Sequence, residues 1–419
     1  MSGDRLRSLL GGPVGSDEPI LLDIGTSTLT AVRAVAKPDL KTGHLLAHPV
    51  METLPLAASD CAALGSDCAR AGFLFETIDP HCETFTDAFG VEWLRVDGSS
   101  TPVRHPLEHA SLGEIVKHPR PIWPELVQVP DVSHRGQIVV ADAPCPGLLD
   151  LSFALRNSWV CLDDMTSNWR SISALLDWSL DTIVAAYERM LSGLPYAPDV
   201  VVYGDDLGFQ QSMFVSEIDF RNFVRPRMRT LISRLRRLTP AAICFHSCGA
   251  IRPILPDVCD LGIELLNFDG GARGMVCSEI RREVPKGLVF HGCSDLVALG
   301  RSVRAGNLAS VALLTAEVVD SAPVIAAPMD NIYTAADVAD VQLGARHLRE
   351  LAPDDVAAIR RLGPVRSIIA NAAEQALSAE PAALLGAPPE IFRITRDADA
   401  HRLGSITHRT QGKADHTLQ

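Results

Sequence analysis

The sequence predicts an α/β protein built as a (β/α)8 TIM barrel, and two observations lead to that prediction. Short apolar runs rich in β-branched residues alternate with amphipathic segments of helix length along most of the chain. Such an alternation is typical of a parallel sheet covered by helices. Neither a G-x-G-x-x-G after the first strand nor a G-x-x-x-x-G-K-[ST] is present, so a dinucleotide-binding or P-loop fold loses its main support.

The strands are expected where the apolar runs are short, and the helices where apolar residues recur with helical spacing. The strand runs are 20–23, 137–141, 200–203, 242–245, 263–266, 288–290 and 324–326. The helical segments are 169–191, 216–238, 251–260 and 307–319. Ser216 followed by Asp219 is typical of a helix start, whereas Pro253 and Pro256 interrupt the 251–260 segment.

Residue composition and hydrophobic periodicity change twice along the chain, and these changes predict three parts. Residues 1–130 carry prolines, histidines and aromatic residues without long periodic segments, so we expect an irregular N-terminal extension packed on the barrel. Residues 131–335 contain most of the strand–helix alternation and are expected to form the main barrel. Residues 336–419 are expected to form a helical C-terminal extension that ends in a mobile tail.

The composition narrows the range of partners. The 419 residues include 38 Lys plus Arg and 51 Asp plus Glu, a net charge of −13, which argues against nucleic acid or an anionic membrane as a partner. Residues 1–17 are polar and Gly-rich, without the apolar core of a secretory signal, and no apolar run is long enough to span a bilayer. We therefore expect a cytoplasmic protein whose ten cysteines are reduced.

Polar residues follow nearly every predicted strand, and in a parallel barrel the active site gathers at the C-terminal ends of the strands. These candidates are Asp23, Asp142, Asp205, Asp206, His246, Cys248, Asn267, His291, Cys293 and Asp330. We expect Asn267, Asp142 and Asp330 to bind substrate, and Asp23 to take part in catalysis.

Within this set, the pair His246-x-Cys248 is the most specific indication of a metal site. Imidazole and thiolate two residues apart at a strand end can face the same side, and both are good zinc ligands. The alternative is that His246 hydrogen-bonds a backbone group while Cys248 fills space before a glycine turn. His291-x-Cys293 repeats the spacing on a later strand, where it could add a ligand or line the cavity.

Two further groups could carry out chemistry. Asp205 and Asp206 could supply a metal ligand, a general acid or base, or a partner for a substrate amine or hydroxyl; alternatively, one caps the following turn and the other is solvated. Arg252 could receive a substrate carboxylate, or simply be solvated on a first helical turn.

The run 245–257, continuing through 261–267, resembles the uroporphyrinogen decarboxylase superfamily, and within it the branch of corrinoid-dependent methyltransferases most closely. Further similarities stand in the expected order along residues 18–335, namely 87–93, 105–107, 204–208, the F-x-x-P-R-like run 223–227 and the P-x-x-N-I-like run 328–332. The resemblance implies a single barrel with its cavity at the strand C-termini.

Two departures from that superfamily shape the prediction. Uroporphyrinogen decarboxylases carry an arginine-rich N-terminal motif for the tetrapyrrole carboxylates, and nothing of that kind stands near Asp23. In the methyltransferase branch zinc is held by His-x-Cys and a distant third Cys; His246 and Cys248 match the first two, but the third position falls at about Ile325, which cannot ligate. A substitute ligand is therefore expected, with Cys293, His291, Glu264, Asp205 and Asp206 as the candidates.

The resemblance and the residues together predict a corrinoid-dependent methyltransferase. It would move a methyl group between a small O-, N- or S-methyl compound and cobalt, with zinc assisting and the cobalamin supplied in trans, either free or by a separate corrinoid protein. One alternative is a decarboxylase or other lyase acting on a non-porphyrin acid, with Asp23 or Asp205 stabilising a protonated intermediate and Arg252 holding a carboxylate. Another is a tetrapyrrole- or corrinoid-binding protein without catalysis.

Overall fold

The computed structural model of the chain describes residues 2–11, 20–33, 55–74, 82–96, 99–125, 127–131, 136–329, 331–352 and 354–355. At its centre is a nine-stranded sheet with the order β1-β12-β11-β10-β9-β8-β7-β2-β6. Only the short edge strand β6 (Val127–Gln128) pairs antiparallel, with β2 (Cys68–Phe73); every other pair in this sheet is parallel.

The other parallel strands, in chain order, are β1 (Leu21–Leu22), β7 (Ile138–Ala141), β8 (Val200–Gly204), β9 (Ala242–Ser247), β10 (Leu265–Phe268), β11 (Val289–Ser294) and β12 (Val324–Pro328). The first and the last of the parallel strands in the row, β1 and β2, also meet. The backbone N–H of Asp67 donates to the Leu22 carbonyl at 2.8 Å, and the N–H of Ile24 donates to Ser66 Oγ at 3.0 Å. These contacts close the parallel strands into a TIM-barrel-like fold, which confirms the predicted fold class.

The strand β2 was not among the predicted runs, because its sequence Cys-Ala-Arg-Ala-Gly-Phe holds a charge, a glycine and no β-branched residue. Arg70 is nevertheless buried in it, opposite Asp142. Both β1 and β2 precede residue 131, so two strands of the barrel lie before the boundary that the sequence predicts.

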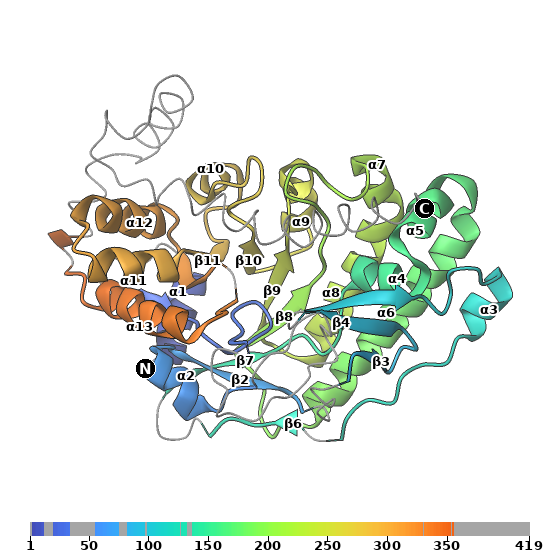
Figure 1. Cartoon of the computed structure of the whole chain (residues 1–419), viewed down its shortest axis with the longest axis horizontal. Helices are drawn as coiled ribbons and strands as arrows, with labels where there is room; N and C mark the ends of the chain where they lie inside the picture. Colours follow the sequence, from blue (N-terminus) through green and yellow to red (C-terminus); the bar gives the residue numbers. More distant parts are fainter. Residues whose placement is uncertain are drawn as a thin grey trace, which may run out of the picture.

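Helices cover the outside of the barrel (Figure 1). On one side lie α11 (Leu296–Arg304), α12 (Leu308–Asp320) and α13 (Ala335–Arg349), and on the other α4 (Leu148–Arg156), α6 (Trp169–Ser192) and α8 (Arg225–Leu238). The remaining helices are α1 (Ser2–Gly11), α2 (Ala58–Leu64), α3 (Leu112–Lys117), α5 (Ser158–Ser167), α7 (Glu217–Asp219), α9 (Leu255–Cys259) and α10 (Cys277–Glu283). A small antiparallel sheet, β3 (Thr84–Thr86), β4 (Glu92–Val96) and β5 (Ser99–Arg104), is inserted between β2 and β7.

The predicted helix boundaries near the site are explained by capping and proline. Ser216 accepts a hydrogen bond from the Asp219 N–H at 3.1 Å and begins α7, which continues through a π-helical turn, Phe220–Val224, into α8. The predicted 251–260 helix is a 3₁₀ turn, Arg252–Ile254, followed by the short α9, since each proline removes a backbone donor.

The barrel interior is packed with apolar side chains at its lower end. This lower layer comprises Leu21, Cys68, Ile138, Val140, Val200, Val202, Cys244, Leu265, Val289 and Ile325, with Leu6 and Leu9 of α1 packed against it. Alternate residues on the same strands, such as Val201, Ile243 and Phe290, face the covering helices instead. The two-residue period of a strand therefore decides which side chains face inward.

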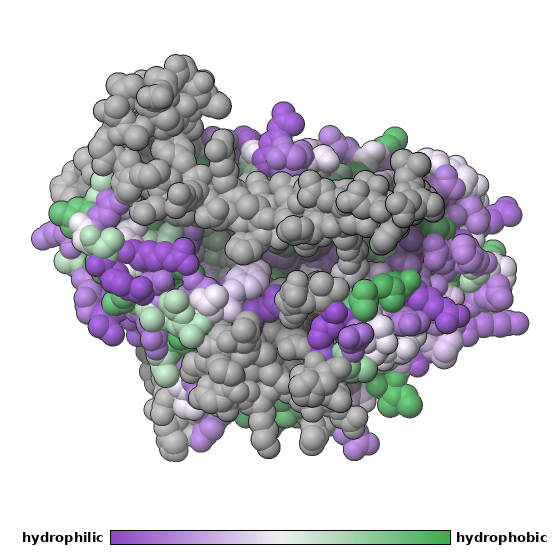
Figure 2. Space-filling view, in the orientation of Figure 1, coloured by the Kyte–Doolittle hydropathy of each residue, from purple (hydrophilic) through white to green (hydrophobic). Residues whose placement is uncertain are grey.

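None of the described helices is both long and apolar enough to cross a membrane. On the face shown in Figure 2, the described surface is largely hydrophilic and its hydrophobic atoms form separate patches.

Candidate active site

A second, polar layer lies above the apolar one at the C-terminal mouth of the barrel. It consists of the residues two positions further along each strand: Asp23, Arg70, Asp142, Gly204, His246, Asn267, His291 and Ala327. Six of these eight positions hold a charged or hydrogen-bonding side chain. All six except Arg70, which lies in the unpredicted strand β2, were expected at strand ends from the sequence.

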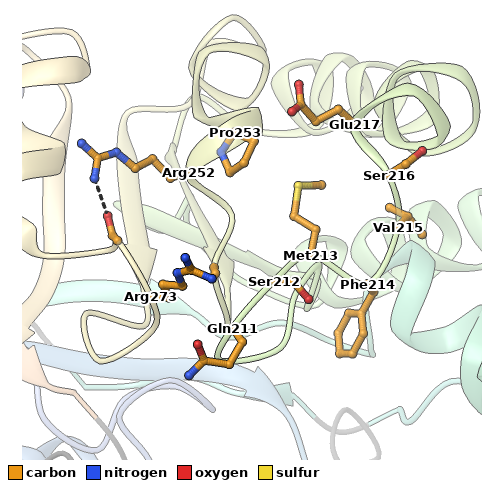
Figure 3. Close-up of a pocket in the computed structure, with 12 residues that line it drawn as sticks. Gln211, Ser212, Met213, Phe214, Val215, Ser216, Glu217, Arg252, Pro253 and Arg273 are labelled. Atoms are coloured by element: carbon orange, nitrogen blue, oxygen red, sulfur yellow. Dashed lines mark hydrogen bonds between the residues drawn. The ribbon is translucent and has the colours of Figure 1, made fainter.

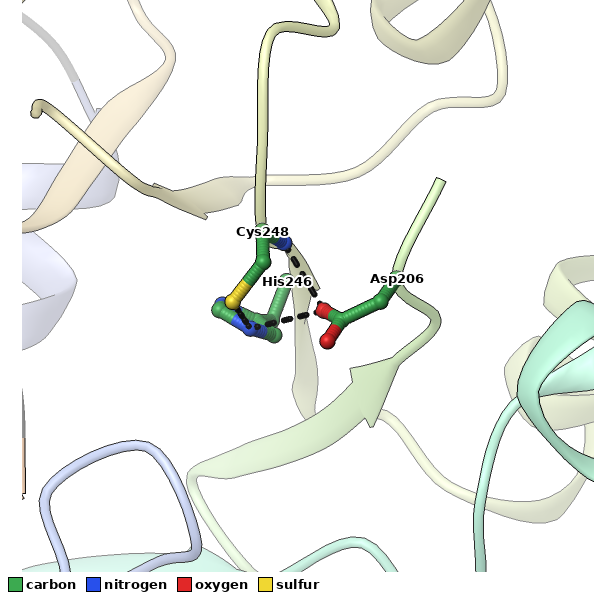
Figure 4. A group of neighbouring side chains, drawn as sticks. All are labelled: Asp206, His246 and Cys248. Atoms are coloured by element: carbon green, nitrogen blue, oxygen red, sulfur yellow. Dashed lines mark hydrogen bonds and ion pairs between the residues drawn. The ribbon is translucent and has the colours of Figure 1, made fainter. Parts of the chain in front are cut away.

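Asp206, His246 and Cys248 form a cluster at this mouth (Figure 4). Their potential ligand atoms all lie within 4.8 Å of one another. His246 Nε2 is 3.3 Å from Cys248 Sγ and 3.3 Å from Asp206 Oδ1, and the Cys248 N–H donates to Asp206 Oδ1 at 2.8 Å. Of the five candidates for a third ligand, Asp206 is the one whose carboxylate oxygen lies in this cluster with His246 and Cys248.

The cluster fits a catalytic zinc ion by its donor set. Imidazole nitrogen, thiolate sulfur and carboxylate oxygen are all zinc ligands, and three protein ligands are typical of sites that keep a position for substrate. All three side chains are half-buried, so a ligand could reach them from solvent. Burial alone lowers the pKa of His246, but the hydrogen bond and charge of Asp206 outweigh it and raise that pKa above its ordinary value.

Two glycines bring the ligand-bearing loops together. A Cβ on Gly249, which has φ +83°, would lie 2.2 Å from the Gly208 carbonyl, so these backbones can touch only without side chains. The Leu207 N–H also donates to Ser247 Oγ at 3.0 Å, and the Ala250 N–H donates to the Phe209 carbonyl at 2.9 Å. The loop after β8 thus lies directly on the turn after β9, beside Cys248.

Asp205 points into the protein interior, unlike the adjacent Asp206. It is fully buried, and its carboxylate accepts hydrogen bonds from the Leu149 N–H at 2.9 Å, the Asp150 N–H at 3.2 Å and the Tyr203 hydroxyl at 2.9 Å. Burial raises the pKa of Asp205 to about 7. Its contacts anchor the start of α4 to the end of β8.

Asp150 also belongs to this region, although the sequence did not predict it as a site residue. Its carboxylate accepts the Asp206 N–H at 2.9 Å, and burial raises its pKa, with the charges of Asp206 and Asp205 adding to the effect. The first turn of a helix is a common place for an acidic residue, so nothing in the sequence marks Asp150 as a support for Asp206.

A hydrogen-bonded chain leads from the cluster across the barrel mouth. His246 Nδ1 is 2.6 Å from Asn267 Oδ1, Asn267 Nδ2 is 2.8 Å from His291 Nδ1, and His291 Nε2 is 2.9 Å from Asp23 Oδ2. The hydroxyl of Thr26 donates to the other oxygen of Asp23. The structure therefore links Asp23, Asn267 and His291 to the cluster, although none of them is in it.

Asp142 lies in a separate buried pair. It is 3.4 Å from Arg70 Nη2 and accepts the Thr28 N–H at 2.9 Å. Its described contacts are with the barrel's own strands and loops. The prediction that Asp142 binds substrate stays a prediction.

The other proposed zinc ligands lie elsewhere. Glu264 precedes β10 at the opposite end of the barrel, where it accepts the Ile243 N–H at 2.9 Å and pairs with Arg236. Cys293 interacts with Cys277, and the hydrogen bond between the two thiols raises the pKa of Cys277. Ile325 lies in the apolar lower layer, and Asp330 lies outside the described residues.

Arg252 lines a cavity of about 590 Å³ between the loop after β8 and the turn after β9 (Figure 3). Met213 and Phe214 lie on one side of this cavity, and Arg252 with Pro253 on the other. The guanidinium of Arg252 is already paired, with Glu279 at 2.9 Å and with Glu283. Its charge is therefore compensated within the protein, whereas a carboxylate substrate would need an available cation.

Comparison with known proteins agrees with this architecture. The profile of the family Uroporphyrinogen decarboxylase matches residues 158–319, a stretch that includes all three members of the cluster. The resemblance to this superfamily is confirmed. Among the solved structures with a similar fold is a methyltransferase from Methanosarcina mazei, at a TM-score of 0.54 and 16% identity, over 82% of this chain and 97% of that one. No curated protein sequence matches the chain.

Proposed function

We propose that this chain is an enzyme, a zinc-assisted methyltransferase that exchanges a methyl group between a small O-, N- or S-methyl compound and the cobalt of a corrinoid. The corrinoid would come from a separate protein or as free cobalamin. The observation that carries the proposal is the Asp206, His246 and Cys248 cluster, whose donor atoms lie within 4.8 Å of one another at the barrel mouth. The methyltransferase activity that gives the solved Methanosarcina mazei protein its name is a second support, brought to this chain as part of the proposal.

The reaction sets a simple requirement. The electron pair of the broken bond stays on the atom that loses the methyl group, and the new bond uses an electron pair of the atom that receives it. Charge therefore develops or disappears on the substrate heteroatom. Zinc held by these three ligands would supply a Lewis acid that stabilises this charge and lowers the pKa of a substrate thiol or hydroxyl.

The residues of the chain would prepare the site for that chemistry. Asp206, His246 and Cys248 would hold the metal, and the Cys248 N–H fixes one oxygen of Asp206 at 2.8 Å. Asp150 and the paired glycines hold the backbone of Asp206 beside the β9 turn. The apolar lower layer closes the barrel below, so substrate and corrinoid would both approach from the mouth.

The lyase alternative receives less support from the same residues. Arg252, which it requires for a substrate carboxylate, is paired with Glu279 and Glu283. Asp205, one of its two proposed catalytic groups, has both carboxylate oxygens engaged with Leu149, Asp150 and Tyr203.

The test measures metal content and methyl transfer in the same preparations. Purified wild-type protein should contain one zinc per chain by elemental analysis, and His246→Ala and Cys248→Ala should lose it. Cys259→Ala is the matched control, because Cys259 is also a half-buried thiol but belongs to α9 and not to the cluster. Activity is followed by the visible spectrum of methylcobalamin formed from candidate methyl donors.

Two results would contradict the proposal. Metal-free protein with full activity would overturn the role of zinc. Decarboxylation of an acid with no methyl transfer to cobalamin would favour the lyase.

A further inference from the structure

We infer that Asn267 is a positioning residue that fixes the proton of the His246 ring on Nδ1 and thereby presents the lone pair of Nε2 to the metal. The inference deepens the proposed function, on which it rests for the identity of the metal. It assigns to Asn267 a role toward the cluster in place of the direct contact with substrate that its strand-end position predicts.

The sheet register brings the three side chains into one row. Asn267 on β10 is the direct partner of His246 on β9 and of His291 on β11. Neighbouring residues in register on parallel strands point to the same face, so the amide lies between the two imidazole rings. Asn267 and His291 are 7% and 5% exposed, which shields the contacts from competing water.

The orientation of the amide follows from a backbone carbonyl. Asn267 Nδ2 lies 2.9 Å from the His291 carbonyl oxygen as well as 2.8 Å from His291 Nδ1. A carbonyl can only accept, so the amide atom next to it must be the NH₂ group and not the oxygen. The reversed amide would put two oxygens in contact, which excludes the usual ambiguity between oxygen and nitrogen.

With the amide fixed, the protons of both rings are determined. Asn267 Oδ1 can only accept, so His246 Nδ1, 2.6 Å away, carries a hydrogen. His291 Nδ1 faces the NH₂ group and accepts, and the proton of that ring is on Nε2, which donates to Asp23 Oδ2 at 2.9 Å. The buried carboxylate of Asp23 thus holds the far end of the chain in place.

The consequence lies at His246 Nε2. This nitrogen faces both Cys248 Sγ and Asp206 Oδ1 at 3.3 Å, and a metal ligand needs its lone pair. A hydrogen bond from the other ring nitrogen to a fixed acceptor is the usual way in which a protein orients a metal-binding histidine. Here the acceptor is an amide that a second histidine and a buried aspartate hold in one orientation.

The test compares two replacements of Asn267 that differ in what they offer His246. Asn267→Leu removes the acceptor and should weaken zinc binding by about 10- to 100-fold, measured by competition with a chromophoric chelator. Asn267→Asp keeps an oxygen for His246 Nδ1–H but loses the NH₂ donor to the His291 carbonyl, so it should bind zinc less tightly than the wild type and more tightly than Asn267→Leu. Ser294→Ala removes a buried hydroxyl that donates to the Gly292 carbonyl at this end of the barrel, and it should leave the zinc affinity unchanged.

A second readout does not depend on the metal. In metal-free protein, at a pH where the ring is neutral, ¹⁵N NMR of the His246 imidazole should show the proton on Nδ1 in the wild type and in Asn267→Asp. In Asn267→Leu it should show a mixture of the two tautomers. Circular dichroism establishes that each variant is folded.

The outcomes separate this inference from the proposed function. If the wild type binds no zinc, the metal-assisted function fails, while the NMR comparison still decides the role of Asn267. If the wild type binds zinc and Asn267→Leu shows the same affinity and the same tautomer, the inference is overturned.

Discussion

The two layers of the barrel interior are built on the same strands, two residues apart, and differ completely in chemistry. The lower layer, with residues such as Val202, Cys244 and Leu265, is apolar, and the polar layer above it holds His246, Asn267 and His291. Residues two positions apart on a strand point to the same face, so both layers face the barrel interior and only the residue types distinguish them. The lower layer therefore stabilises the barrel by apolar packing. The upper layer forms a hydrogen-bonded network, and a small part of that network is exposed at the barrel mouth.

The largest effect is expected where the polar layer is most deeply buried. Asp142→Ala leaves Arg70, which is 2% exposed, without its carboxylate and should lower the free energy of unfolding by about 4 kcal/mol, measured in denaturant. Asp142→Asn keeps an oxygen for the Thr28 N–H and should cost less. Equal costs for the two variants would show that the hydrogen bond to the Thr28 N–H adds nothing beyond the charge, which both variants lack.

The second-largest loss of stability is expected in the apolar lower layer. Leu265 is fully buried, so Leu265→Ala should remove packing and lower the free energy of unfolding by about 3 kcal/mol. Zinc content of the folded protein should stay at the wild-type value, because Leu265 is not part of the ligand cluster. Loss of zinc from the folded variant would mean that the two layers are not independent.

Substitutions of Asp206 and Asp205 compare a carboxylate at the barrel mouth with a buried one at the neighbouring position. Asp206→Asn removes a proposed zinc ligand and should reduce zinc affinity by about 100-fold or more, since even loss of a supporting contact costs 10- to 100-fold. Asp205→Asn keeps an acceptor for the Leu149 and Asp150 N–H groups and a partner for Tyr203, and should retain zinc. Chelator competition on both variants decides which carboxylate binds the metal.

The smallest effect on stability concerns the half-buried carboxylate of Glu317, which lies on α12 among the outer helices. Burial raises the pKa of Glu317, so the folded protein holds this proton to higher pH than the unfolded chain does. Its favourable contribution is present below the unfolded pKa and is lost as pH rises through the folded pKa. Glu317→Gln should therefore be more stable than wild type at neutral pH, by no more than about 1 kcal/mol, with the difference disappearing near pH 4. A constant difference across pH would contradict this origin.

The sequence predicted most of the barrel because its strands are runs such as Val200-Val201-Val202-Tyr203, whose side chains suit a buried strand. The strand β2 was not predicted because Arg70 and Gly72 break that pattern. The charge of Arg70 can be buried there because Asp142, which follows another strand, pairs with it. Local pattern cannot anticipate such a pairing.

The site was predicted in part for a similar reason. His246 and Cys248 are two residues apart in the sequence, so their spacing already indicated a ligand pair. Asp206 comes from a different loop, after the strand has ended and its alternation no longer fixes direction. The sequence therefore could not distinguish its orientation from that of Asp205. The hydrogen bonds of Asn267 depend on the register of three strands, which a single sequence does not reveal.

The contact between Gly208 and Gly249 has a consequence for engineering this protein. The spacing between the two loops that carry Asp206 and Cys248 is set by main-chain atoms in direct contact, and not by the lengths of side chains. A library that randomises exposed residues such as Phe209 could alter what enters the mouth while leaving this spacing intact. A single methyl group at position 249 would instead push the loops apart and change the spacing of the donor atoms without replacing any of them.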